Sequence, residues 1–262
     1  MTGTINDISV IAPHLVLSGG IVLMLLAAAF ARGRAMVQPI TMITLACSIG
    51  ATVLFTPVLP VACTGLLAAD GLAGLAAFLI MLASFTIALL SKAYFDQHKA
   101  PIAEFCILQL LATLGGVVLV TSSHFASLVL GIELLGIPLV VMAAYRPGSS
   151  AGLEAGFKYL ILSGMSSAVL LFGMALLFAA TGSLQFAAVA GALRDLSSRP
   201  ALLFLGAMLL TCGLVFKLAL VPFHVWAPDV YEGSPAPVTM LYATVSKAAV
   251  ITVLLRLFPP PV

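Results

Sequence analysis

Long apolar runs recur along the whole chain, separated by proline, glycine and charged residues. Eight of them have about the 20-residue length that an α-helix needs to cross a hydrocarbon core of roughly 30 Å. They cover residues 11–30, 39–59, 70–91, 103–121, 124–144, 157–180, 201–225 and 237–257. None alternates in the manner of a barrel strand, and only helices or closed barrels satisfy every backbone group in lipid. The pattern predicts an all-α, polytopic transmembrane bundle of about eight spans.

The connections between these runs carry their own predictions. The fourth and fifth runs are separated only by "SSH", which predicts a tight antiparallel hairpin. Segment 181–199 is apolar with few charges, so it is expected to form a short helix at the outer interface, with Ser183 as a possible cap.

A proline-rich segment follows the seventh run. Residues 222–237, "PFHVWAPDVYEGSPAP", contain four prolines, which are incompatible with a straight helix. Pro222 cannot donate to the carbonyl of Leu218, so the helix around Lys217 should be kinked or broken, with a free carbonyl near the lysine. If the helix continued, Lys217 and His224 would share a face, since seven residues are about two turns.

Composition removes several classes of function. The chain is 62% hydrophobic and 8% charged, against roughly 25% charged in a soluble domain, and its net charge is only +2. Without a lysine and arginine cluster, a nucleic-acid partner is not expected. The four cysteines form no CxxC pair and are interpreted as small core residues, and no nucleotide-binding glycine motif occurs. We therefore expect no metal, redox or nucleotide cofactor on this chain.

The basic residues near the ends of the runs predict the orientation. The first apolar run is long for a signal peptide and is retained as a span. Counting alternate sides, five basic residues against three favour one side as cytoplasmic, which places both termini on the non-cytoplasmic side. The larger group is Arg32, Arg34, Lys92, Lys99 and Arg146, and the smaller group is Arg194, Arg199 and Arg256.

Four titratable residues fall inside the runs rather than at their ends. Glu133 lies in the fifth run, Lys217 and His224 in the seventh, and Lys247 in the eighth. A charge at the bilayer centre costs roughly 2.5–3.5 kcal/mol, so these side chains should face the bundle interior and share a hydrated or paired environment. An acid and several bases in such an environment have coupled titrations, which is the chemistry of a proton relay.

Each of these residues also has a structural interpretation. Glu133, Lys217 and Lys247 could form ion pairs that only fix helix packing, and His224 could be a hydrogen-bonded residue at a helix end. Pro138, five residues after Glu133, is expected to interrupt the fifth helix and support a locally wet site. Lys158 falls at the start of the sixth run, where it could reach the interface or assist the relay.

The segment Phe216 to Ala249, "FKLALVPFHVWAPDVYEGSPAPVTMLYATVSKAA", closely resembles the antiporter-like membrane subunits of NADH:quinone oxidoreductase, respiratory complex I, and most of all the subunit N branch. Two further segments agree with this resemblance. They are "LVLGIELLGIPLVVMAAYR" and "EAGFKYLILSGMSSAVLLFGMALLFAATGSLQF".

The resemblance implies a proton-translocating subunit of a bacterial cytoplasmic (inner) membrane. Glu133 would pair with Lys217, Lys247 would continue the path, and His224 and Lys158 would assist. The partners would be the other membrane and peripheral subunits of the complex, which carry NAD, FMN, iron–sulfur clusters and quinone. The implied organisation is a three-helix segment (1–100), a first five-helix repeat with a broken seventh helix (101–258) and a tail (259–262) at which truncation is expected, since the family has a second repeat.

Two other functions remain open at this point. Subunits of multi-subunit cation/proton antiporters share the lysine and glutamate motifs, although the wording of "GSPAPV" and "TVSK" favours the redox complex. The chain could also be a scaffold that packs helices and conducts nothing.

Overall fold

The computed structural model of the 262-residue chain describes residues 2–29, 36–55, 61–63, 65–98, 101–145, 148–195 and 199–258. The described residues are mainly helical. In chain order the elements are α1 (Thr2–Ala29), α2 (Val37–Phe55), β1 (Val61–Cys63), β2 (Leu67–Ala69), α3 (Gly71–His98), α4 (Ala103–Thr121), α5 (Phe125–Ala143), α6 (Ser150–Thr181), α7 (Phe186–Asp195), α8 (Pro200–Leu218), α9 (Trp226–Gly233), α10 (Ala236–Leu241), the π-helical turn η3 (Tyr242–Ser246) and α11 (Lys247–Leu257).

All eight predicted spans are present, and the chain is a multi-pass membrane protein. The helices that are long and apolar enough to cross a membrane are Ile11–Ala29, Val37–Leu54, Gly71–His98, Ala103–Thr121, Phe125–Ala143, Ser150–Thr181, Pro200–Leu218 and Ala236–Leu257. An even number of crossings returns the chain to the side on which it began. Of the residues that predict the orientation, Arg32, Arg34, Lys99 and Arg146 lie outside the described residues, and the side of the termini stays a prediction.

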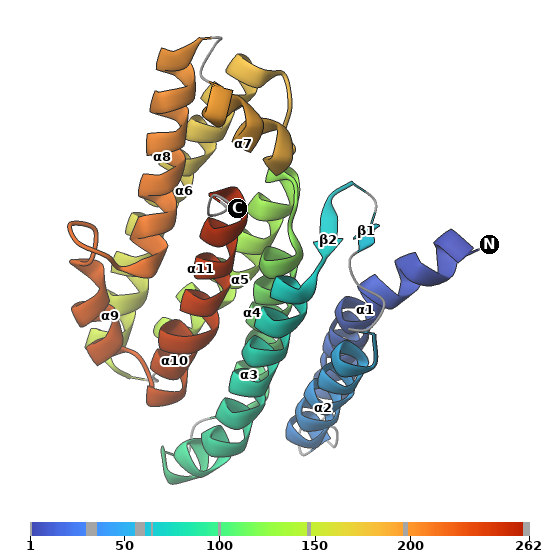
Figure 1. Ribbon diagram of the computed structural model, residues 1–262. Coiled ribbons are helices and arrows are strands. Elements are labelled where there is room, and N and C mark those ends of the chain that lie inside the picture. The colour runs from blue at the N-terminus through green and yellow to red at the C-terminus, as the bar shows by residue number, and fades with distance from the viewer. Residues whose placement is uncertain are drawn as a thin grey trace.

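The spans form three neighbouring groups (Figure 1). Helices α1 and α2 lie on one side and pack against α3 and α4, while α6, α8 and α9 lie on the other side. Between them stand α3, α4, α5 and the red α10–α11 segment, whose turn η3 contacts α3 and α4. The short helix α7 lies across one end of the bundle, as the apolar segment 181–199 predicts.

One small element differs from the all-helical expectation. Strands β1 and β2 pair antiparallel between α2 and α3, with Val61 opposite Ala69. Each has three residues, too few for an alternating pattern to be read from the sequence. The hydroxyl of Ser127 donates to the carbonyl of Leu66 (2.7 Å), and Leu67 bridges Ser122, so the hairpin lies over the tight α4–α5 turn. That turn has the predicted "SSH" form, and His124 Nδ1 accepts from the Ala126 amide (3.0 Å).

Two helix pairs approach each other closely at glycines. A Cβ on Gly115 of α4 would lie 2.3 Å from the backbone nitrogen of Leu135 on α5. Between α6 and α8, a Cβ on Gly213 would lie 2.6 Å from the Cβ of Leu170. Small residues let backbones meet in this way where apolar lipid provides no hydrophobic drive for helix association. The α6–α8 contact sets the position of the last turn of α8, because Gly213 lies one turn before Lys217.

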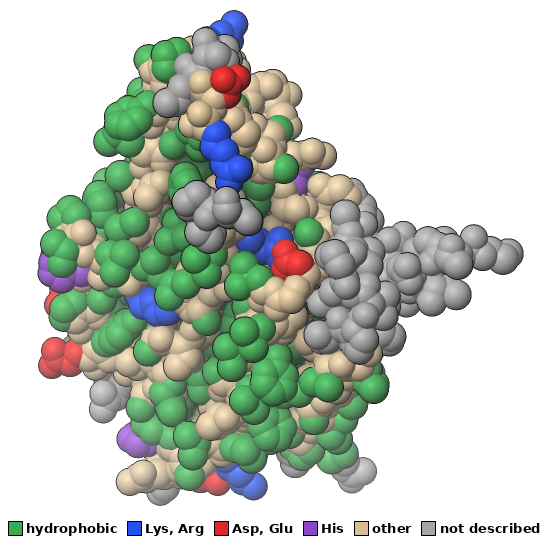
Figure 2. Space-filling model, viewed as in Figure 1, with side chains coloured by type: hydrophobic (Ala, Val, Ile, Leu, Met, Phe, Trp, Pro, Cys, Tyr) green, Lys and Arg blue, Asp and Glu red, His purple; other side chains and the backbone are tan. Residues whose placement is uncertain are grey.

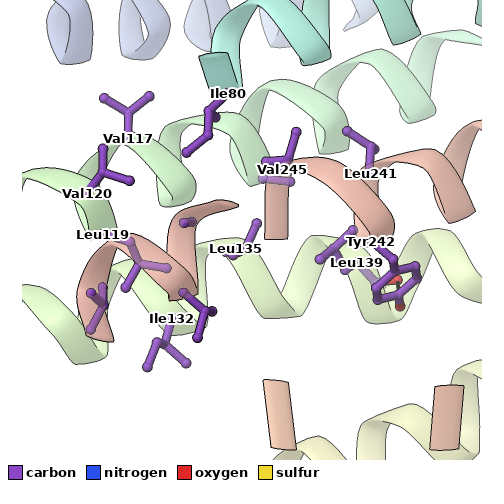
Figure 3. Packing of buried hydrophobic residues seen from close by; sticks show 14 of the residues in the cluster. Ile80, Val117, Leu119, Val120, Ile132, Leu135, Leu139, Leu241, Tyr242 and Val245 are labelled. Atoms are coloured by element: carbon purple, nitrogen blue, oxygen red, sulfur yellow. Dashed lines mark hydrogen bonds between the residues drawn. The ribbon is translucent and has the colours of Figure 1, made fainter. Parts of the chain in front are cut away.

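The central core is formed by side chains from several spans (Figure 3). Leu241 of α10 and Val245 of η3 meet Ile80 of α3 and Leu135 of α5 in one buried cluster. Tyr242 is almost fully buried, and its hydroxyl donates to the carbonyl of Leu139 (2.8 Å). The outer surface is largely apolar in the view of Figure 2, as expected for a face turned to lipid.

Several local predictions need correction. Pro138 does not interrupt α5, which runs through it to Ala143, because loss of a single backbone bond is tolerated when neighbouring helices pack around it. Ser183 accepts from the amide of Gln185 (3.2 Å) and so closes the turn before α7 rather than capping the helix itself. Cys106 is buried as predicted, whereas Cys47 is exposed on α2 and is not a core residue.

Candidate functional site

The seventh span ends earlier than its apolar run. Helix α8 ends at Leu218, where Ala219 adopts a left-handed conformation (φ 55°) and its amide donates to the carbonyl of Phe216 (2.9 Å). The expected break is therefore present but falls before Pro222, which lies in an exposed turn preceding α9. The exact position of the break could not be read from the prolines, since it depends on a left-handed alanine.

Lys217 occupies the last turn of α8 and is buried, with 7% of its surface exposed. Its Nζ donates to the hydroxyl of Ser163 on α6 at 2.5 Å. A Cβ on Gly136 of α5 would lie 3.7 Å from the same nitrogen, so the amine also faces α5. The glycine contacts between α6 and α8 bring these helices near enough for this hydrogen bond.

The carbonyls freed at the end of α8 have side-chain partners. The indole Nε1 of Trp226 donates to the carbonyl of Phe216 (3.0 Å), and Lys247 Nζ donates to the carbonyl of Lys217 (3.3 Å). The broken helix end that the sequence predicts near the lysine thus offers the carbonyls of Phe216 and Lys217 to side chains. Two lysines from different spans meet at the broken end of α8.

Lys247 follows the π-helical turn Tyr242–Ser246 and begins α11. It is partly buried, and its Nζ lies 5.4 Å from the centre of the Trp226 ring, within range of a cation–π contact. π-Helical turns are rare and are frequently found at functional sites. The turn shifts the register of the eighth span just before its lysine.

Glu133 is partly buried on α5, and its Oε1 accepts a hydrogen bond from the Ser167 hydroxyl of α6 (2.9 Å). No ion pair joins Glu133 to Lys217 in the part of the chain that the structure describes. Direct contact between the two charges, which their predicted pairing suggests, is therefore absent. Their partners Ser163 and Ser167 are instead one helical turn apart on α6.

Lys158 does not join this interior group. Because α6 begins at Ser150, the lysine lies inside the helix rather than at its start, and its side chain is 42% exposed. It forms ion pairs with Glu154 on the same helix (2.7 Å) and with Asp229 on α9 (2.5 Å). These charges surround a surface pocket of about 180 Å³, so the structure places Lys158 in a clamp between α6 and α9.

His224 is also separated from the interior. It lies in the exposed turn between α8 and α9, and its carbonyl accepts from the amide of Ala227 (2.9 Å). The shared face expected for Lys217 and His224 is absent, because α8 ends between them. The structural interpretation of His224 as a residue near a helix end fits its position.

A narrow cavity of about 10 Å³ lies beside Lys217. Its lining includes Lys217, Tyr159 and Ser246, together with apolar residues of α4 and α5. Its volume corresponds to about one water molecule, and its polar groups could hold one. Within the described ranges, no three residues among His, Cys, Asp and Glu gather in an arrangement that would hold a metal ion.

Sequence reasoning identified the interior charges but missed their neutral partners. The missed partners are Ser163, Ser167 and Trp226, which bind the charged groups or the broken helix end. Burying a serine or a tryptophan in a membrane costs little free energy, so burial cost did not single these residues out. The only available indication was the four-residue spacing of the two serines, which places them on one face of a helix.

A family described as "NADH:quinone oxidoreductase/Mrp antiporter, TM" matches residues 122–261 of the chain. NADH-quinone oxidoreductase subunit N of Chromohalobacter salexigens is 40% identical over 247 residues, which are 94% of this chain and 52% of that protein. The subunit N of Methylococcus capsulatus is also 40% identical and is likewise covered over 52% of its length. The chain thus spans about half the length of these curated relatives.

Chains of three solved membrane complexes have the same fold as this chain. A chain of respiratory complex I from Thermus thermophilus, determined with bound aureothin, superimposes with a TM-score of 0.81 at 34% identity, covering 95% of this chain and 54% of that one. A chain of the archaeal membrane-bound sulfane sulfur reductase follows, with a TM-score of 0.79, 25% identity and 97% and 54% coverage. A chain of the Mrp complex from Dietzia sp. shares the fold at 21% identity, with a TM-score of 0.78 and 94% and 48% coverage.

Proposed function

Because the chain belongs to the NADH:quinone oxidoreductase and Mrp antiporter transmembrane family, we propose that it works as a proton-translocating membrane subunit of NADH:quinone oxidoreductase, of the subunit N type. The relatives that are 40% identical carry that name. Its place would be the bacterial cytoplasmic membrane, with the termini on the non-cytoplasmic side. Its partners would be the other membrane and peripheral subunits, which would hold the NAD, FMN, iron–sulfur and quinone chemistry.

One observation carries this proposal: two interior lysines meet at a broken helix. The Lys217 side chain is buried and bonds to a serine, while Lys247 bonds to the carbonyl of Lys217. Titratable groups are costly within a membrane, and a series of them with polar partners is typical of a proton path. A structural pair would need only one lysine and one carboxylate.

The proposed mechanism uses the separation between Glu133 and Lys217. Quinone reduction elsewhere in the complex would shift helices at a neighbouring subunit and change how far the Glu133 carboxylate lies from the Lys217 amine. Withdrawal of the carboxylate makes the protonated amine less stable, so the proton leaves it. Lys247, at the same broken end, is the next base along the path.

The decisive experiment neutralises Glu133 and Lys217 in the complete complex in its native membrane. We expect Glu133→Gln and Lys217→Ala each to lower proton movement per NADH oxidised, measured in inverted vesicles, more than they lower the amount of assembled complex. Lys158→Gln is the matched control, because that lysine is exposed and paired. Normal pumping in the assembled double variant would refute the proposal.

The alternative is a subunit of a cation/proton antiporter. The Mrp chain shares the fold, but at 21% identity this likeness carries no functional argument. Purification in mild detergent separates the two functions. Co-migration with flavin, iron–sulfur absorbance and NADH:quinone reductase activity supports the redox complex, and a particle without redox centres supports antiport.

A further inference from the structure

Two serines of α6 each contact one of the charged groups of the site. Lys217 Nζ donates to Ser163 Oγ (2.5 Å), and Ser167 Oγ donates to Glu133 Oε1 (2.9 Å). Residues four apart on a helix stand on one face, with β carbons about 5–6 Å apart. A single turn of α6 therefore presents one hydroxyl to each charged group, and those groups come from two other helices.

These contacts differ from the usual behaviour of hydroxyls in the same bundle. Thr211, Thr244 and Thr252 each donate to the carbonyl four residues earlier in the chain, at 2.7–2.8 Å. Such bonds only satisfy the hydroxyl within its helix. Ser163 and Ser167 contact ionisable side chains on other helices instead, so their hydroxyls are bound into the site.

The chemistry of a hydroxyl suits a partner that changes its charge. Serine can donate or accept, and its hydrogen rotates to fit the neighbour. Ser163 can accept from an ammonium group or donate to a neutral amine. In the same way, Ser167 can donate to a carboxylate or accept from a carboxylic acid. A charged partner would fit only one of the two states, because an opposite charge stabilises the ionised form.

We infer that Ser163 and Ser167 are positioning residues for proton movement, which hold the Lys217 amine and the Glu133 carboxylate at opposite ends of one turn of α6 and keep them from closing into a direct ion pair. A direct pair in a dry interior is costly to break, so it would hold the proton in place. The inference rests on the proposed function and adds α6 to the two helices that carry the charges.

The test compares three serines of one helix in the complete complex. Ser163→Ala and Ser167→Ala should lower proton movement per NADH oxidised roughly threefold to tenfold, the range expected from loss of a typical intramolecular hydrogen bond. Ser166→Ala is the matched control, because Ser166 is buried on the same helix but donates to the backbone carbonyl of Gly213 (3.0 Å). It should retain the unmodified ratio, even if the yield of complex falls.

Two further readouts separate positioning from helix packing. Ser163→Thr and Ser167→Thr keep the hydroxyl and should restore most of the pumping. Ser167→Ala placed on Glu133→Gln should cause no additional loss, because the serine acts through the carboxylate. Equal effects of all three alanine variants, or no rescue by threonine, would overturn the inference.

The same set of variants distinguishes this inference from the proposed function. If Glu133→Gln and Lys217→Ala abolish pumping while Ser163→Ala and Ser167→Ala match Ser166→Ala, the positioning role is wrong and the proton path stands. If Glu133→Gln and Lys217→Ala leave pumping intact, the proposed function itself fails.

Discussion

Two groups of charged side chains in this bundle are held by different kinds of partner. Lys217 and Lys247 donate to a hydroxyl and to a backbone carbonyl, and Glu133 accepts from a hydroxyl. Lys158 and Arg256, by contrast, form ion pairs with carboxylates. Among the described residues, neither Lys217, which is buried, nor Lys247 forms an ion pair with a carboxylate, which is the reverse of the pairing that membrane burial would favour by cost alone.

The kind of partner separates side chains that stay charged from side chains that can gain or lose a proton. An ion pair stabilises the charged state of both partners, so it suits a clamp, meaning here an ion pair that joins two helices or their ends. A neutral hydrogen-bond partner serves a group in either protonation state, so it suits a relay. The kind of partner, more than the burial of the charge, therefore distinguishes the relay group (Glu133, Lys217 and Lys247) from the clamps, which are the ion pairs of Lys158 and Arg256.

The comparison can be tested most directly by displacing Lys217 from Ser163 without changing any charged residue. Gly213→Leu would place a Cβ 2.6 Å from the Cβ of Leu170, pushing α8 from α6 near the Lys217–Ser163 contact. We expect a loss of more than about 3 kcal/mol of stability, because backbones that meet at a glycine cannot yield locally. The measurement is the yield and melting temperature of the purified complex.

Gly164→Leu provides the control for this prediction on α6 itself. A Cβ at Gly164 meets nothing within 4 Å and the residue is exposed, so leucine there should be tolerated. If Gly213→Leu assembles and pumps as well as Gly164→Leu, the relay does not depend on close helix packing, and the contrast with the clamps loses its basis.

A second prediction concerns the ion pair between Arg256 of α11 and Asp70, the residue just before α3. Arg256 Nη2 donates to Asp70 Oδ1 (2.6 Å), and the arginine side chain is only 9% exposed while that of Asp70 is 40% exposed. Asp70→Asn would leave the arginine charge without its carboxylate, at a cost on the order of 2 kcal/mol, since solvent at Asp70 reduces the full penalty. Thermal denaturation of the complex should report this loss.

Proton movement per NADH oxidised should be unchanged in the Asp70→Asn complex that survives purification. That outcome is the essential part of the prediction, because it distinguishes a clamp from a relay. A drop in the pumping ratio equal to that of Lys217→Ala would show that ion-paired charges also take part, and the kind of partner would no longer distinguish the two groups.

The sequence predicted the spans well, because membrane thickness and backbone satisfaction constrain length and composition strongly. All eight apolar runs correspond to helices, and the "SSH" turn and a short helix within 181–199 were also predicted, while the place of that helix at the membrane interface stays a prediction. The break in the seventh span was located only approximately, because it depends on the left-handed conformation of Ala219 rather than on a proline.

The site was predicted in part. Burial cost identified Glu133, Lys217 and Lys247, but it could not specify their partners, which come from other helices and are set by packing. His224 was grouped with them by its place in the seventh run and Lys158 by the family resemblance, and the structure separates both from the interior group. Because α8 ends at Leu218, His224 lies outside the interior, and carboxylates from α6 and α9 hold Lys158 near the surface. Contacts between helices distant in sequence decide which charges belong together.

A third prediction tests the neutral partners of the second lysine. Trp226→Phe keeps a ring beneath Lys247 but removes the bond to the Phe216 carbonyl, which should cost about 1 kcal/mol. Trp226→Leu also removes the cation–π contact and should cost roughly 0.5–2 kcal/mol more. Melting temperatures measure both changes. If phenylalanine and leucine are equally destabilising, the ring does not hold Lys247.

The smallest effects should come from the clamp of Lys158. Its side chain and that of Asp229 are 42% and 54% exposed, so water and salt already screen their attraction. Lys158→Asp should weaken the contact between α6 and α9, and adding Asp229→Lys should restore it, because an ion pair depends on opposite charge and not on which helix carries which sign. The single and double variants should differ less in melting temperature as salt is raised toward about 1 M, where the Debye screening length falls to roughly 3 Å.

A lysine of the relay group cannot be exchanged with its partner in this way, since the proton path requires the base at one place. Loss of pumping that persists in the exchanged pair would therefore move Lys158 from the clamps to the relay.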